Sequence, residues 1–176
     1  MIYLSFDVGI KNLAYCQIDT SINNSIETDK WNIVDWNVID CSAKNYILKL
    51  IEELEAIPNL LDSDIILIEK QPSCNPKMRI ISTAIYVYFT IRIQYENNKN
   101  IKLMYYSPKY KLRCCNEKFD IKVKSKYGYN KKLAIHHTQY LLDKSIFLEY
   151  FNSHKKKDDL ADSFLQGLSY ILFFSK

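Results

Sequence analysis

Near its start the chain reads IYLSFDVGIKNLAYCQID, residues 2–19, two apolar segments separated by a glycine turn. Residues 2–8 are rich in aliphatic and aromatic side chains and predict a β-strand with Asp7 at its end. Residues 12–19 predict a second strand, and Gly9 begins the tight turn between the two. The expected product is a pair of strands that carries a carboxylate where the first strand ends.

The rest of the chain supplies further strands and helices. Residues 31–40 alternate apolar and polar side chains, as a strand does, and residues 64–70 (DIILIEK) form a β-branched run typical of a buried central strand. The remaining predicted elements are a strand at 102–106 and helices at 43–56, at 131–142 beginning near Asn130, and at about 157–173. This order predicts an α/β fold, a central mixed sheet of about five strands flanked by helices, in a single domain spanning residues 1–176.

Residues 77–96 are rich in Ile, Val, Thr and aromatic side chains, but a run of about 20 residues is too long for an ordinary strand. We therefore predict a helix. Its apolar residues lie nearly all round, which indicates burial on more than one side. A subunit interface and a fully enclosed core helix both explain this pattern.

Composition excludes several classes of protein. With 176 residues, 48% of them hydrophobic and 25% charged, the chain has the balance of a globular protein and not of a disordered one. The longest uncharged apolar runs, residues 80–91 and 163–175, fall short of the roughly 20 residues that span a membrane. The five cysteines lack CxxC spacing and the first residues do not resemble a signal peptide. We expect an intracellular protein with free thiols and no membrane partner.

Four acids stand out because of their apolar surroundings. Asp7 and Glu69 lie at the C-terminal ends of predicted strands, where the ligands of α/β sheets collect. Asp159 and Asp162 are three residues apart in the last predicted helix and therefore project from one face. Four converging carboxylates repel one another, and hard divalent cations relieve that repulsion. The pattern favours a magnesium site of the two-metal type that hydrolyses phosphodiesters.

Each acid taken alone has a simpler explanation. Asp7 could shape the turn that follows it, and Asp159 could complement the dipole of its helix. Glu69 could pair with Lys70 or with Lys11. The metal site is favoured because all four acids occur together with a strongly basic segment.

Positive charge is concentrated in residues 109–132, which have a local net charge of +7 where the whole chain has +4. Tyr110, Phe119, Tyr127 and Tyr129 are interleaved with the basic residues, a mixture typical of surfaces that follow phosphates and stack on bases. A solvated lysine-rich loop is the alternative. Together with one lysine of the first turn, the predicted nucleic-acid contacts are Lys11, Lys109, Lys111, Arg113, Lys122, Lys124, Lys126, Lys131 and Lys132.

Four segments resemble a known family when they are taken in order. These are FDVGIKNLAY (6–15), IEKQPS (68–73), KKLAIHH (131–137) and KKDDLADS (156–163). Together they resemble the poxvirus Holliday junction resolvases, of the RuvC branch of the RNase H-like superfamily. The resemblance extends over essentially the whole chain and implies an RNase H-like fold of the RuvC type.

The resemblance also implies roles for particular residues. The catalytic acids and metal ligands that it implies are Asp7, Glu69, Asp159 and Asp162. Lys132 aligns best with a lysine of RuvC and is the implied catalytic lysine, which would contact the scissile phosphate or neutralise charge in the transition state. Lys131 is the competing assignment. Two Mg²⁺ ions per site are implied, with Mn²⁺ as a possible substitute, and no organic cofactor.

A homodimer that recognises four-way DNA junctions is the assembly implied by this family. Each subunit would nick one of two opposed strands, and the pair of symmetric cuts would resolve branched viral replication or recombination intermediates. If the chain is viral, the expected location is the host cytoplasm. The alternatives are another RNase H-like nuclease, which cuts RNA–DNA hybrids or flaps, and a junction-binding module without catalysis. An actin-like or sugar-kinase ATPase is disfavoured, because such proteins need several phosphate-binding glycine loops and this chain has three glycines.

Overall fold

A five-stranded mixed sheet forms the centre of the computed structural model, which describes residues 1–21, 31–96 and 100–175. The strand order is β3-β2-β1-β4-β5. β1 pairs antiparallel with β2 and parallel with β4, while β2–β3 is antiparallel and β4–β5 is parallel. The strands are β1 (Ile2–Asp7), β2 (Leu13–Asp19), β3 (Asn32–Ile39), β4 (Ile65–Glu69) and β5 (Lys102–Tyr106).

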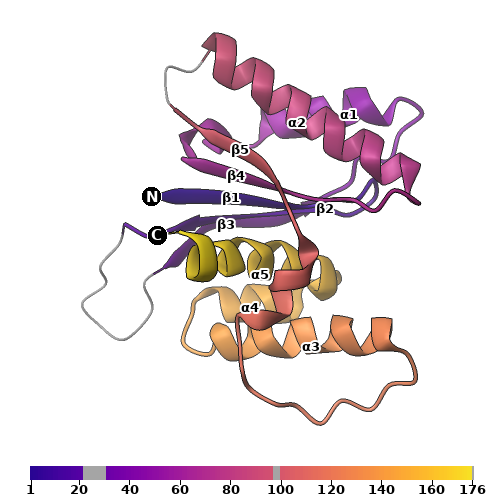
Figure 1. Ribbon diagram of the computed structural model, residues 1–176, viewed down its shortest axis with the longest axis vertical. Helices are drawn as coiled ribbons and strands as arrows, with labels where there is room; N and C mark the ends of the chain where they lie inside the picture. The colour runs from indigo at the N-terminus through magenta and orange to yellow at the C-terminus, as the bar shows by residue number, and fades with distance from the viewer. Residues whose placement is uncertain (22–30, 97–99, 176) are drawn as a thin grey trace.

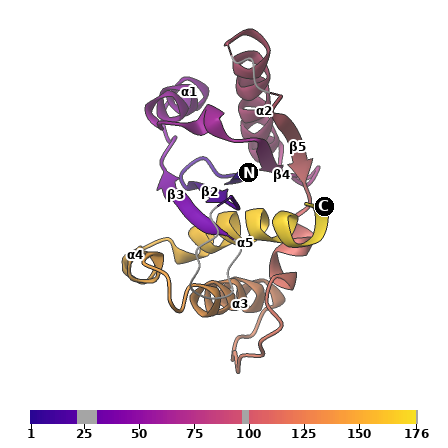
Figure 2. The same cartoon turned by 90° about the vertical axis from the view of Figure 1, so that its left-hand side faces the viewer.

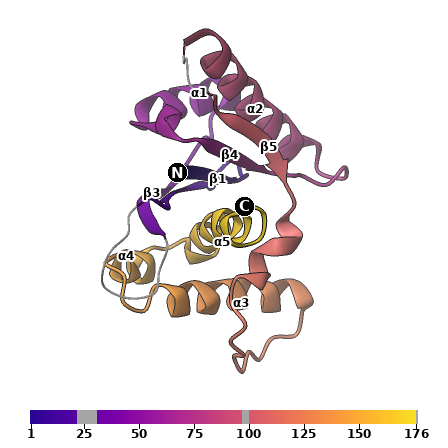
Figure 3. The same cartoon turned by 60° about the vertical axis from the view of Figure 1, so that its left-hand side comes forward.

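Helices cover both faces of this sheet (Figure 1). They are α1 (Tyr46–Ala56), α2 (Pro76–Glu96), α3 (Lys126–Leu141), α4 (Phe147–Ser153) and α5 (Lys157–Phe174), with short 3-10 helices η1 (Leu60–Asp62) and η2 (Pro108–Arg113). Helices α1 and α2 lie on one face, and α5 lies on the other with α3 and α4 beyond it, as the turned views of Figures 2 and 3 also show. The predicted α/β architecture is therefore confirmed.

The alternation of side chains along β1 separates structural from functional residues. Leu4 and Phe6 are fully buried in the core shared with α1 and α2. Ser5 and Asp7 point to the opposite face, because successive side chains of a strand alternate. The amide of Gln166 on α5 donates hydrogen bonds of 3.0 Å to the Ser5 hydroxyl and to the Phe6 carbonyl oxygen. The end of β1 is thus fixed against α5.

Two glycines allow close approaches that position this region. A Cβ on Gly167 would lie 3.1 Å from Cδ1 of Ile18 and 3.2 Å from Cβ of Ser5, so its absence lets α5 lie close to the sheet. A Cβ on Gly9 would collide with the carbonyl oxygen of Asn12, so the β1–β2 turn requires glycine there.

All the predicted strands are present, but the segment after β5 differs from expectation. Helix α3 begins at Lys126 and not near Asn130, because the hydroxyl of Ser125 caps it by accepting the Gly128 amide proton at 3.0 Å. Residues 109–132 are consequently no continuous loop, since η2 and the first turns of α3 occupy both of its ends.

Helix α2 is not enclosed. Its inner side chains, including Ile85 and Phe89, are fully buried, but Ile80, Val87 and Ile91 are each nearly half exposed. The enclosed-core interpretation of residues 77–96 is therefore wrong, and an apolar face remains on the surface. Within the described residues, no helix combines the length and apolar character that crossing a membrane requires.

Candidate active site

One pocket of about 510 Å³ collects the four acids that the sequence singled out. Asp7 ends β1, Glu69 ends β4, and Asp159 and Asp162 lie on the first turns of α5. The pocket is lined by Asp7, Val8, Glu69, Gln71, Asn75, Met78, Pro108, Lys111, Leu112, Tyr127, Asn130, Lys131, Asp159 and Asp162. Three elements far apart in sequence therefore bring the carboxylates to the C-terminal edge of the parallel strands.

The register of the sheet places Asp7 beside Glu69. Phe6 pairs with Ile68 across the parallel β1–β4 ladder, so the following residue of each strand reaches the same edge. The amide of Gln71 donates a 2.7 Å hydrogen bond to Oε2 of Glu69 and orients that carboxylate. The strand register and the Gln71 hydrogen bond thus hold Glu69 beside Asp7 at the sheet edge.

Lys111 is a central member of the site. Its ammonium lies 2.7 Å from Oδ1 of Asp7, 2.9 Å from Oε1 of Glu69 and 3.8 Å from Oδ2 of Asp162. The residue is only 4% exposed. It lies on η2, directly after β5, and β5 runs parallel to β4, so the chain leaves the sheet at the edge where the acids lie.

Burial and like charge make this cluster electrostatically demanding. Desolvation is the main cause that raises the pKa of Asp7 to about 8, with Lys111 acting in the opposite direction. Desolvation also raises the pKa of Asp162 and of Asp159. Burial alone would lower the pKa of Lys111, but Asp7, Asp162 and Glu69 raise it above its ordinary value. Lys111 therefore stays charged and balances the acids.

Lys111 was expected to contact DNA phosphates from an exposed basic segment, and the structure contradicts that exposure. The lysine is buried because it neutralises the carboxylates. Sequence reasoning placed it among nine basic residues of one segment. One feature of the sequence could have distinguished Lys111 from its neighbours. It follows the predicted strand 102–106 by a few residues, and that strand ends at the edge of the sheet where the acids lie.

The two competing lysines of α3 lie in different environments. Lys131 lines the pocket, and its ammonium lies 2.5 Å from Oδ2 of Asp158. Burial acts to raise the pKa of Asp158, but the hydrogen bond and the charge of Lys131 outweigh it, so the pKa lies below its ordinary value. Lys132 is exposed and is not among the residues that line the pocket. The geometry therefore places Lys131, and not Lys132, next to the acids.

The other predicted DNA contacts are on the surface. Lys11 lines a separate pocket with Lys155 and Lys156. The cations of Lys109 and Arg113 lie over the Tyr110 ring, 4.7 and 5.3 Å from its centroid. The remaining exposed cations of the predicted set are Lys122, Lys124 and Lys126.

The donor set fits a hard divalent cation. Asp7 and Glu69 already share one positive charge, that of Lys111, and Asp159 and Asp162 add carboxylate oxygens to the same pocket. Within residues 1–21, 31–96 and 100–175, no three His, Cys, Asp or Glu side chains converge closely enough to hold a metal as they stand. The lysine occupies the place between the acids that a cation would need.

The sheet is RNase H-like, with carboxylates at the end of β1, at the end of β4 and on the last helix. Proteins with this arrangement form a class, that of the RuvC-like resolvase fold. A family model described as "Poxvirus A22 protein" matches residues 1–173. The chain belongs to this family, which confirms the resemblance that the sequence motifs indicate.

Two relatives show how far the similarity extends. The Holliday junction resolvase of fowlpox virus is 29% identical over 176 residues, which cover 97% of this chain and 92% of that protein. Protein L451 of Acanthamoeba polyphaga mimivirus is 35% identical to this chain over 138 residues. That match covers 72% of this chain, and this chain spans 33% of the mimivirus protein.

Solved structures agree with the fold. The fowlpox virus resolvase in complex with Holliday junction DNA superposes with a TM-score of 0.65 at 26% identity, and the whole of each chain is covered. RuvC of Thermus thermophilus gives a TM-score of 0.63 at 12% identity, over 98% of this chain and 95% of that one. The central sheet and its helices are thus those of the RuvC-like resolvases.

Proposed function

We propose that the protein is a divalent-metal-dependent endonuclease that resolves four-way DNA junctions. The observation that carries this proposal is the convergence of Asp7, Glu69, Asp159 and Asp162 in one pocket of a poxvirus A22 family fold. The fowlpox relative is a Holliday junction resolvase, and it was crystallised with junction DNA. Branched viral replication intermediates in the host cytoplasm are the substrates that fit this assignment.

The four acids would hold the metal, two Mg²⁺ ions in the full arrangement, with Mn²⁺ as a substitute. Bound cations of this kind supply Lewis acidity for phosphodiester hydrolysis. Asp7 and Glu69 present their oxygens from a rigid sheet edge, and Gln71 keeps Glu69 oriented. The acids would bind and position the metal once the ammonium of Lys111 has moved from between Asp7 and Glu69.

Lys111 and Lys131 would serve the DNA side of the reaction. With a cation bound to the acids, Lys111 would no longer be needed as their counter-ion, and its ammonium would be available to contact the scissile phosphate. Lys131 lines the same pocket and, held by Asp158, can bind a neighbouring phosphate oxygen. This assignment replaces Lys132, which becomes an exposed DNA contact on α3.

A homodimer is the assembly that we propose for symmetric cutting. Ile80, Val87 and Ile91 form an apolar face on α2, and α1 also exposes Leu48 and Ile51. A groove between these helices has mostly apolar walls, lined by Ile47, Pro76, Arg79, Ile80, Thr83, Ala84 and Val87. Contiguous exposed apolar patches of this kind mark protein interfaces. A second copy of the chain is the proposed occupant.

The test is cleavage of a labelled immobile four-way junction, run beside duplex, flap and RNA–DNA hybrid substrates with Mg²⁺ or with EDTA. We expect paired nicks at symmetric positions on the junction, and none with EDTA. Cutting of hybrids or flaps in preference to the junction would keep the nuclease assignment but overturn the substrate. Tight junction binding without cutting under any metal would favour a non-catalytic binding module.

A further inference from the structure

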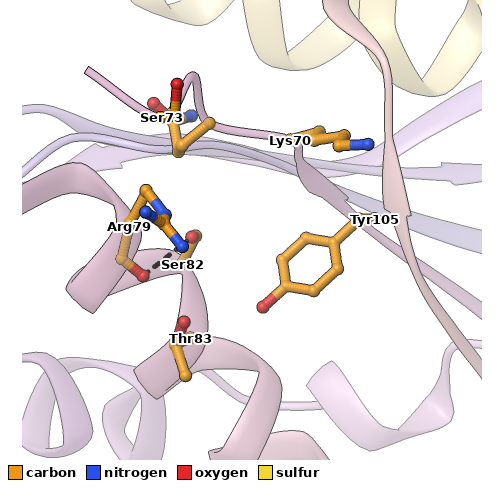
Figure 4. A pocket seen from close by; sticks show the side chains of 7 residues that line it. Lys70, Ser73, Arg79, Ser82, Thr83 and Tyr105 are labelled. Carbon is orange, nitrogen blue, oxygen red and sulfur yellow. Dashed lines mark hydrogen bonds between the residues drawn. The ribbon is translucent and has the colours of Figure 1, made fainter. Parts of the chain in front are cut away.

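A second pocket, lined by polar and charged residues, adjoins the pocket of the four acids. Its volume is about 400 Å³, and Gln71 lines both pockets. Figure 4 shows side chains of the β4 end, the following segment, α2 and β5 around one space. The lining residues are Lys70, Gln71, Ser73, Arg79, Ser82, Thr83 and Tyr105.

Strand alternation builds the two pockets on opposite faces of the sheet. Glu69 points to the face of α5, so the next residue, Lys70, belongs to the face of α2. The same alternation on β5 puts Tyr106 against Tyr170 of α5, with the ring centroids 5.6 Å apart. Tyr105 stacks on Tyr86 of α2 at 5.0 Å with an interplanar angle of 16°. The edge that holds the acids therefore also presents a basic pocket across the sheet.

The chemistry of this lining suits a phosphate group. Lys70 and Arg79 contribute positive charge, and four hydroxyl side chains surround them, whereas none of the described residues in the lining is acidic. Neither cation forms an ion pair with a carboxylate in the described part of the chain. The Ser82 hydroxyl donates to the Arg79 carbonyl oxygen at 3.0 Å and can still accept. Arg, Lys, Ser, Thr and Tyr are the usual side-chain donors to DNA phosphates.

We propose that this pocket binds a non-scissile backbone phosphate of the DNA strand that is being cut. The inference rests on the proposed nuclease function and adds a second contact on the same strand. Gln71 separates the two pockets, so a strand that crosses it would place one phosphate at the acids and another at Lys70 and Arg79. The second contact would fix the register of the strand relative to the cut.

The experiment compares the wild type with Lys70→Ala, Arg79→Ala and the double variant. Binding of a fluorescent four-way junction is measured in EDTA over a series of salt concentrations. We expect about tenfold weaker binding for the double variant and a salt dependence that is shallower by about one unit, as for the loss of one phosphate contact. Lys77→Ala is the matched control, because Lys77 shares the first turn of α2 but does not line the pocket.

A methylphosphonate scan identifies the phosphate. Single neutral linkages are placed in turn beside the cleavage position, and each junction is titrated with the wild type and the double variant. One position is expected to weaken the wild type but leave the double variant unaffected. Equal affinity of both proteins in the salt series, or equal sensitivity at every linkage, would overturn the pocket assignment.

Two further readouts separate this proposal from its neighbours. If the wild type itself fails to bind junctions, that result contradicts the proposed function. If the wild type binds and the double variant binds equally well, the result contradicts the pocket assignment alone. Thermal melting and light scattering of each variant show that folding and oligomeric state are unchanged, which matters because Arg79 and Thr83 also line the groove between α1 and α2. Loss of dimers in Arg79→Ala with full binding in Lys70→Ala would assign Arg79 to the interface and contradict the proposal.

Discussion

Lys111 lies among carboxylates that repel one another. Its ammonium contacts Asp7 and Glu69 and approaches Asp162, and all four side chains are largely withdrawn from water. A buried charge that loses its partner is costly, whereas the intact pair is close to neutral in free energy. The lysine therefore acts as a built-in counter-ion for the acids that we propose bind a divalent cation.

Replacing Lys111 by Met tests the counter-ion role through protein stability, with no need to measure cleavage. The variant leaves the acids uncompensated, and we expect its free energy of unfolding in EDTA to fall by about 3 kcal/mol. Millimolar Mg²⁺ should restore part of the loss, because the metal supplies the missing charge. Chemical denaturation with and without Mg²⁺ measures both effects, and Lys132→Met on the surface of α3 is the control. A Lys111→Met protein as stable as the wild type in EDTA would contradict the counter-ion role.

The acids themselves should be dispensable for folding and essential for cutting. Burial raises the pKa of Asp7, so a neutral side chain is tolerated there and Asp7→Asn should fold normally. We expect Asp7→Asn, Glu69→Gln and Asp162→Asn to lower the rate of junction cleavage by at least about a hundredfold. Junction binding, measured in parallel by fluorescence anisotropy, should change little.

Asp158→Asn is the matched control for this series, because Asp158 precedes the two α5 acids of the pocket in sequence but pairs with Lys131. It should retain much more cleavage than Asp162→Asn. Acid variants that cut at the wild-type rate would exclude a catalytic role for the site.

At the scale of elements, the strands and most helices follow from sequence because their signals are local. Apolar runs and their alternation are sufficient for β1, β2, β3, β4 and β5. The predicted start of α3 near Asn130 is too late, because the Ser125 cap begins the helix at Lys126 and the helix continues through Gly128. A cap of this kind depends on one hydroxyl, and a periodicity analysis does not detect it.

The candidate site was only partly predictable for a similar reason. Asp7, Glu69, Asp159 and Asp162 are recognisable because each is an acid in an apolar setting or part of a helical pair. Lys111 is a cation in a cationic segment, and its burial depends on where β5 lies in the sheet. What distinguishes Lys111 from the neighbouring cations, and Lys131 from Lys132, is which of them lies next to the acids in the folded protein. The local sequence pattern does not contain that information.

Helix α5 carries two of the acids, so its distance from the sheet should control the site. Gly167→Val would add methyl groups where a Cβ alone already lies 3.1 Å from Ile18 and 3.2 Å from Ser5. We expect a loss of about 2 kcal/mol in stability, and a larger relative loss of cleavage than of binding. Gly167→Ala should show a smaller effect in thermal melts. A Val variant with unchanged melting temperature would show that α5 can shift without cost.

At the scale of the whole molecule, cations line several neighbouring surfaces. Lys111 and Lys131 of the segment 109–132 line the pocket of the four acids, and the pocket of Lys70 and Arg79 shares Gln71 with it. Lys11 and the two lysines that precede α5 form a further basic pocket. This distribution fits a substrate with several phosphate-bearing arms better than a small ligand.

The exposed lysines before and at the start of α3 should carry much of the salt dependence. We expect Lys122→Ala, Lys124→Ala and Lys126→Ala combined to reduce the slope of log affinity against log salt by up to about three units. Junction binding between low and moderate salt measures it, and cleavage at saturating protein should be little changed. Unchanged affinity and slope would show that this segment lies outside the DNA footprint.

The proposed dimer would bury the apolar face of α2 against a second copy, and this links that face to the outcome of the proposed reaction. Val87→Glu places a charge on a side chain that is 48% exposed, so it should leave the fold intact but prevent burial against a partner. We expect monomers by light scattering. On a plasmid that extrudes a cruciform, the variant should give nicked circles where the wild type gives linear DNA, because the two cuts are no longer made within one complex. Val34→Glu on β3, with 49% exposure, is the control. If Val87→Glu stays dimeric and still yields linear product, the interface lies on another face, and the apolar surface of α2 needs a different partner.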